Sequence, residues 1–217
     1  MNLLARLVFI ALSAISLSSC DEEWSWNQKI TISVLTPSGT KVASSVQRGT
    51  IIKYGWWQHQ WGYDGTEYLR GEAVALEVAP GKFLFALLSG TPRAWAVFVP
   101  KEKLREAAGP ALASLREARE VPAKDYPMFV MFEDIDDPAS VKHVNPNRLD
   151  AILGTGYRLT SITITLTTEP VTDGRLGHVL SWLSTHKGKL KPSAKKYADQ
   201  LSFEETLYGS DFQRPLD

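Results

Sequence analysis

The chain has 217 residues, with 24 Lys and Arg against 24 Asp and Glu, so it is close to neutral at pH 7. Neutrality argues against a nucleic-acid-binding role, because such binding requires clustered basic side chains that neutralise phosphates. Cys20 is the only cysteine, so a hydrophobic core has to hold the fold without an internal disulfide. The length suits one domain, or at most two small ones.

The N-terminus has the pattern of an export signal. Residues 1–6 supply positive charge and residues 7–17 form an apolar stretch. That stretch is shorter than the roughly 20 residues that cross a membrane, so it indicates a removable signal and not a span. Residues 17–20 then read Leu-Ser-Ser-Cys. This tetrapeptide resembles the cleavage box of bacterial lipoprotein signal sequences, whose form is Leu, small, small, Cys.

The resemblance implies that the Cys20 thiol receives a diacylglycerol, that cleavage occurs just before it, and that its new amino group receives an acyl chain such as palmitate. Two or three chains, at about 0.8 kcal/mol per buried methylene, hold a protein on a bilayer essentially permanently. We therefore expect a signal peptide at 1–19, a tether at 20–27, where Trp24 and Trp26 can still dock back, and one domain at 28–217. The alternative is an ordinary secretory signal whose Cys20 is a small buried residue.

The two residues after the cysteine refine the expected location. Asp21 and Glu22 follow Cys20, a pattern that resembles the signal by which enteric bacteria keep lipoproteins in the inner membrane. We expect the protein in the bacterial cell envelope, anchored by lipid and facing the periplasm, with a preference for the inner membrane.

The first half of the domain shows the alternation of strands. Ile30–Leu35 alternates apolar and polar residues, a turn signal follows at 37–39, and Val42–Val46 continues the pattern, which predicts a hairpin. Further strands are expected at 72–78 and 82–88, joined through Pro80-Gly81. Another strand is expected at 95–99, where Pro100 stops it.

The second half mixes helices and strands. Apolar residues at helical spacing from Leu104 to Leu115 predict a helix, with a break or new start at Gly109-Pro110. Strands are expected at 128–132 and 159–168, and an amphipathic helix at 176–183. The predicted class is α+β, a mainly antiparallel β-sheet with two or three helices packed against it.

Several stretches resemble an uncharacterised family of exported proteins from alphaproteobacteria. They are residues 70–74, 79–88 and 137–141, with Asn145-Pro146 beyond them. That family has no assigned reaction, so the resemblance implies no functional residue.

An aromatic segment is the most suggestive local feature. Between Tyr54 and Tyr68 six Tyr and Trp residues crowd around three glycines. Flat aromatic faces stack on sugars, and amphipathic aromatic rings are also favoured at a membrane interface. The simpler interpretation is a strand, turn and strand whose rings pack on each other across the sheet. The candidate ligand contacts in this segment are Trp56, Trp57, Trp61 and Tyr63.

A second candidate is acidic and comprises Glu133, Asp134, Asp136 and Asp137. Such carboxylates can converge on Ca²⁺ or divide acid and base roles. However, a calcium loop of the EF-hand type would need Gly at position 139 and Glu at position 145, where this chain has Ala and Asn. Asp137-Pro138 is also typical of the start of a turn or helix.

Other chemistry is not indicated. The histidines, at positions 59, 143, 178 and 186, have no metal-ligand spacing, and the chain has no phosphate loop or nucleophile motif. A Lys cluster at 187–196 reads as a solvated face or a contact with anionic lipid.

From the sequence we expect no cofactor, no metal, no nucleic-acid partner and no catalytic residue. The predicted function is a lipid-anchored envelope protein with a binding or structural role, its partners being the membrane and another envelope protein or a glycan. One alternative is peptidoglycan binding through 54–68, and another is a hydrolase or metal protein that uses 133–137.

Overall fold

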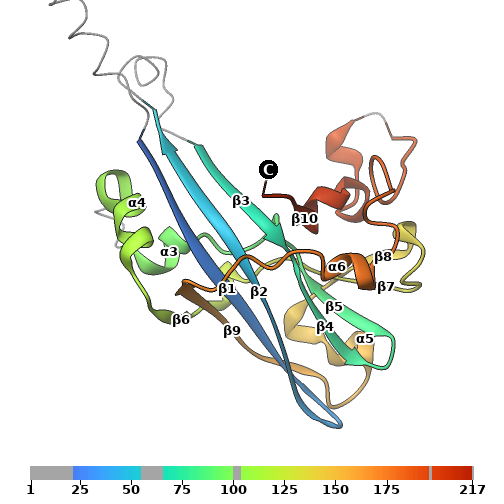
Figure 1. Ribbon diagram of the computed structural model, residues 1–217. Coiled ribbons are helices and arrows are strands. Elements are labelled where there is room, and N and C mark those ends of the chain that lie inside the picture. Colours follow the sequence, from blue (N-terminus) through green and yellow to red (C-terminus); the bar gives the residue numbers. More distant parts are fainter. Residues whose placement is uncertain (1–21, 55–65, 100–103, 196, 217) are drawn as a thin grey trace, which may run out of the picture.

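The computed structural model describes residues 22–54, 66–99, 104–195 and 197–216, and in them two antiparallel sheets form most of the fold (Figure 1). The six-stranded sheet has the order β10-β3-β2-β1-β9-β6, and the four-stranded sheet has the order β4-β5-β7-β8. The strands of the larger sheet are β1 (Glu22–Thr36), β2 (Gly39–Lys53), β3 (Thr66–Glu72), β6 (Ala118–Glu120), β9 (Arg158–Thr167) and β10 (Gln213–Arg214). Those of the smaller sheet are β4 (Val74–Ala79), β5 (Lys82–Ala86), β7 (Phe129–Phe132) and β8 (Val141–Val144).

The helices are short. The described residues form α3 (Ala94–Phe98), α4 (Leu104–Ser114), α5 (Asp150–Leu153) and α6 (Leu176–Val179). Short 3-10 turns occupy Ala123–Asp125, Pro138–Ser140, Pro146–Arg148, Ala198–Gln200, Glu204–Thr206 and Gly209–Asp211. The predicted α+β class with a mainly antiparallel sheet is confirmed.

The β1–β2 hairpin is the longest feature of the larger sheet, and its far end projects at the bottom of Figure 1. Ile30, Ile32 and Val34 point into the core, as the alternation predicts, while the residues between them face outward. Pairing continues back to Glu22, which lies opposite Lys53. Residues 22–27, expected to belong to a tether, are therefore the first part of β1.

Two tryptophans explain why the strand starts so early. Trp26 is buried, and its ring occupies the space that a side chain at Gly49 would need. Trp24 lies in the same way against Gly109 of α4. Both rings dock onto the domain because a glycine opposite each of them lets the aromatic face reach the backbone.

The chain passes from one sheet to the other between β3 and β4. Gly71 has a positive φ of 118°, a conformation that favours glycine, and Ala73 separates the two strands. Beyond this point the chain pairs with β5 and no longer with β2. Residues 48–52 of β2 are therefore paired with β3, and the part of β2 nearer the hairpin turn is not.

The two central strands of the smaller sheet, β5 and β7, are covered on both faces. Leu84 of β5 and Phe129 of β7 belong to the core shared with the larger sheet and the helices α3 and α4. Their neighbours Phe85 and Val130 face the other way, into a second core closed by the C-terminal segment. This explains why 83–88 and 128–132 are continuously apolar, since strands covered on both faces need no polar side.

Three local predictions were wrong. The break or new start expected at Gly109-Pro110 is absent, because α4 runs through both residues as one helix. Residues 95–99, expected as a strand, fall mostly in helix α3, where Ala94 and Phe98 are buried four positions apart on one helical face. The helix expected over 176–183 ends at Val179, after which Leu180 leaves helical geometry with φ −112° and ψ 80°. Trp182 then donates a hydrogen bond to the carbonyl of Ile135, 2.9 Å away, so tertiary packing decides this segment.

None of the helices in the described ranges is both long and apolar enough to span a membrane.

Candidate functional site

The sites predicted from the sequence mostly lie outside the described residues. These are Cys20 and the aromatic contacts Trp56, Trp57, Trp61 and Tyr63. The described flanks of the aromatic segment are well ordered by pairing: the Tyr54 hydroxyl lies 2.7 Å from Thr66 Oγ1. Lys53 is opposite Glu22 and forms an ion pair with it at 3.5 Å. The described residues on either side of the aromatic segment, Lys53 and Thr66, therefore lie at the end of the sheet where β1 begins.

The acidic segment forms an exposed turn, in which its carboxylates serve the backbone. Asp134 accepts a hydrogen bond from the Asp136 N–H at 3.1 Å, and Asp137 accepts one from Ala139 N–H at 2.9 Å. Asp137 caps the turn at Pro138, as its sequence predicted. Glu133 faces Lys142 at 3.6 Å. These contacts account for the acidic residues as turn formers.

The described histidines do not gather at the acidic turn. His143 packs on the ring of Phe203, and His186 lies edge-on to Trp182 with Nε2 3.0 Å from the Lys189 carbonyl. Within the described part of the chain, no group of three or more His, Cys, Asp or Glu side chains is placed to hold a metal ion.

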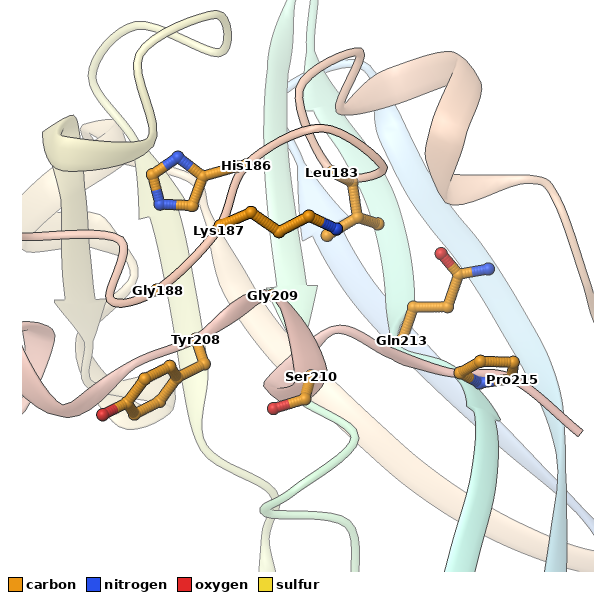
Figure 2. A pocket seen from close by; sticks show the side chains of 9 residues that line it. All are labelled: Leu183, His186, Lys187, Gly188, Tyr208, Gly209, Ser210, Gln213 and Pro215. Atoms are coloured by element: carbon orange, nitrogen blue, oxygen red, sulfur yellow. The ribbon is translucent and has the colours of Figure 1, made fainter. Parts of the chain in front are cut away.

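An open hollow of 470 Å³ lies in the C-terminal segment. Figure 2 shows His186 and Lys187 on one side of it and Tyr208 and Ser210 on the other, with Lys187 extending towards Leu183. Its lining carries hydrogen-bond donors and one cation, but no carboxylate. The donors and the Lys187 ammonium of this lining could bind an oxygen-rich group.

The C-terminal segment is held by a buried carboxylate, Glu72, at the junction between the sheets. Its side chain accepts hydrogen bonds from the N–H groups of Arg175 and Leu176, both at 3.2 Å, and from the Gln213 amide at 3.2 Å. Burial raises the pKa of Glu72, although these N–H groups oppose the shift, and the nearby charge of Asp173 raises it further. The carboxylate thus joins β3, α6 and β10.

The predicted Lys cluster is partly neutralised within the fold. Lys195 lies 2.8 Å from Glu205, which also accepts the N–H of Ser202 at 2.7 Å. The Lys195 ammonium and these donors lower the pKa of Glu205 to about 2. This part of the cluster therefore stabilises the C-terminal segment.

A groove of 380 Å³ runs beside the unpaired part of β2. Val42 and Ser44 at the edge of β2 line it, together with Val179 of α6. Ala75 and Phe83, from the outer side of the smaller sheet, also line it, and Arg175 stands at its rim. Sequence reasoning missed this site, because a strand's missing neighbour depends on where β3 leaves the sheet.

The one signal for the groove in the sequence is the apolar residue Val42. It lies in the β2 half of a hairpin whose polar face points to solvent, and it is 57% exposed.

No protein-family model, no curated protein and no solved structure matches this chain.

Proposed function

We propose that this protein is a bacterial envelope protein, anchored by lipid at Cys20, that faces the periplasm and acts by contact with another envelope component. The observation that carries the proposal is the Leu-Ser-Ser-Cys box at 17–20 after a charged and then apolar N-terminus. A thiolate is the side-chain nucleophile suited to forming a stable thioether, so a single cysteine at this position fits lipid attachment.

The start of β1 supports an anchored domain. Glu22 is already in the sheet, only two residues after Cys20. A lipid on Cys20 would therefore hold the end of the larger sheet close to the bilayer, with little freedom between anchor and domain. Asp21 favours the inner membrane in this proposal.

The surfaces described above support a contact role. The donor-lined hollow around Lys187 and the groove beside β2 both offer places for a partner to bind. The acidic turn instead uses its carboxylates in local hydrogen bonds. We therefore propose a binding or structural role and no catalytic residue.

Replacing Cys20 with Ala tests the anchor. Because the alanine side chain cannot accept a lipid, the C20A protein should leave the membrane fraction or keep its signal peptide. Fractionation and mass spectrometry of the N-terminal peptide measure both outcomes. Ser19→Ala is the matched control, since it keeps a small residue before the cysteine and should be processed normally. An unmodified thiol on Cys20 in the native protein would contradict the proposal.

Glycan binding is the second candidate. It draws on the crowding of Trp56, Trp57, Trp61 and Tyr63, which connect to the sheet at the end nearest the anchor. Stacking of sugars on these rings is compatible with a peptidoglycan partner. Co-sedimentation with isolated peptidoglycan separates this candidate from a protein contact, with simultaneous Trp56→Ala and Trp57→Ala substitutions as the comparison.

A further inference from the structure

The part of β2 nearest the hairpin turn is an open sheet edge. On one side it pairs with β1 over its whole length. On the other side β3 pairs only with residues 48–52, because the chain turns away at Gly71 into the smaller sheet. Among the described residues no strand covers the edge from Thr40 to Ser44.

The hydrogen bonds of Val46 show in which direction the backbone N–H and C=O groups of this edge point. Its N–H donates to Thr172 Oγ1 and its carbonyl accepts the Thr172 N–H, both at 2.9 Å, so the groups of Val46 point away from β1. Strand backbone groups alternate in direction with a period of two, so those of Ser44 and Val42 also point outward. No hydrogen bond from the described chain reaches these outward groups.

Thr172 already occupies the first position on this edge. It belongs to the segment that crosses the larger sheet from β9 to α6, seen in orange in front of β1 and β2 in Figure 1. After Thr172 the chain leaves the edge, because Arg175 and Leu176 are bound to Glu72. The next positions along β2 remain available to another extended chain.

The groove beside the edge has a mixed lining. Ala75, Phe83 and Val179 supply apolar surface, and Arg175 supplies a positive charge. No carboxylate of the described residues lies within ion-pair distance of Arg175. An extended chain on the edge would direct alternate side chains into this groove.

We propose that the β2 edge binds an extended segment of a partner polypeptide by strand addition, with apolar side chains towards Ala75 and Phe83 and an acidic residue beside Arg175. This inference rests on the contact role proposed above and gives that role a site and a partner class. Unpaired strand edges are ready templates for such pairing, and this edge carries no proline.

The length of the edge favours a short segment over a second copy of the chain. Thr40–Ser44 spans about 17 Å at about 3.4 Å per residue, enough for a segment of about five residues. A stable dimer interface needs about 1,000 Å² or more, and five edge residues supply only a small part of it. A cross-strand neighbour would also cover the exposed side chain of Val42.

The position of the edge suits a partner in the periplasm. Ser44 lies opposite Thr31, nine residues along β1 from Glu22. At about 3.4 Å per residue this places the edge about 30 Å from the end of the sheet that the anchor joins. A partner bound there would stand clear of the headgroup region.

The test is selection from a displayed library of random nine-residue peptides against the full-length protein in detergent. We expect enrichment of peptides with alternating apolar residues and one acidic residue. Ser44→Pro removes one outward N–H while leaving the β1–β2 hydrogen bonds in place. It should weaken binding of the enriched peptides about tenfold or more, whereas Ser44→Ala, which keeps the N–H, should retain binding.

A charge reversal gives an independent readout that does not depend on a proline. Selection against Arg175→Glu should replace the acidic residue of the enriched peptides with a basic one. Binding that is equal in wild type and Ser44→Pro, or an absence of enriched sequences, would overturn the inference.

The Cys20→Ala protein separates this inference from the proposed anchor. Loss of lipid should change its fractionation and leave its selected peptides unchanged. If the wild-type protein is not anchored but still binds the peptides, the result counts against the proposed location alone. If it is anchored but binds no peptide, the result counts against the proposed edge site alone.

Discussion

At the residue scale, Glu72 shows how one buried carboxylate can organise a distant segment. The residue is 1% exposed, and its oxygens bind groups from α6 and β10, more than a hundred positions away in sequence. A charged carboxylate in such a place loses its hydration and regains part of that loss from N–H donors. The pKa of Glu72 is raised because the N–H donors restore only part of the hydration that the charged carboxylate loses on burial.

This pKa has a consequence for stability. Because the folded-state pKa of Glu72 lies above its ordinary value near 4.5, the folded protein binds the proton more tightly than the unfolded chain. The free energy of unfolding should therefore rise as the pH falls from 7 towards 4.5, relative to a Glu72→Gln protein that cannot titrate there. Urea denaturation of both proteins at several pH values measures the difference. The exposed Glu23→Gln is the control, and parallel curves for wild type and E72Q would contradict the assignment.

At the element scale, two glycines set how closely β1 packs against its neighbours, Gly49 in β2 and Gly109 in α4. Trp24 and Trp26 pack on Gly109 and Gly49, where an added methyl would lie 2.5 Å and 2.3 Å from the ring atoms. Real carbon atoms do not approach so closely, so the ring or the backbone has to move. These contacts make residues 22–27 part of the domain.

A pair of helical glycines provides a matched test. Gly109→Ala in α4 should lower the free energy of unfolding by about 1–3 kcal/mol, because the new methyl displaces the Trp24 ring. Gly177→Ala in α6 has open space around it and should be neutral or stabilising by up to about 1 kcal/mol, since alanine reduces the freedom of the unfolded chain. Chemical denaturation measures both, and equal effects would show that Trp24 does not limit position 109.

Secondary-structure propensity gave the wrong prediction in two segments, because tertiary contacts outweighed it there. Residues 95–99 contain β-favouring Trp, Val and Phe, yet α3 forms because Ala94 and Phe98 both reach the core from one helical turn. The expected helix at 176–183 is interrupted because the Trp182 indole binds the Ile135 carbonyl. In contrast, the alternation of 159–168 correctly predicted β9, with Ile162, Ile164 and Leu166 buried.

At the scale of the whole molecule, the C-terminal segment is a layer of the fold. It covers the outer face of the smaller sheet with Leu176, Leu180, Trp182, Leu207 and Phe212. Phe212 packs edge-on against Phe85 with ring centres 5.7 Å apart, and its carbonyl accepts the Ala73 N–H at 2.7 Å. Removing this layer would expose the apolar side chains of Phe85, Val130 and Phe132 on that face of the sheet.

Phe212 therefore tests the role of the whole segment. Phe212→Ala should lower the free energy of unfolding by about 3–5 kcal/mol, because it leaves a cavity in the second core. Limited proteolysis should then cleave the C-terminal segment before the sheets. Tyr197→Ala, in the same segment but 66% exposed, should change stability by no more than about 0.5 kcal/mol. A small effect at Phe212 would mean that the segment is dispensable.

The sequence by itself determined the class of fold, and the export and anchoring signal that it indicates stays a prediction. The alternation at 30–35 and 159–168, the turn at Pro80-Gly81 and the cap at Asp137 are local, because each depends on neighbours a few positions away. The Leu-Ser-Ser-Cys box is equally local, so its interpretation needs no fold.

Only the tertiary structure decided which surfaces are open. The buried state of Glu72, the docking of Trp24 and Trp26, and the unpaired edge at Val42–Ser44 all depend on segments distant in sequence. A strand pattern reports which face of a strand is buried, but it does not report which neighbour lies along its edge. That neighbour is set by the point at which β3 leaves the larger sheet, and the groove beside β2 exists because the chain turns there at Gly71.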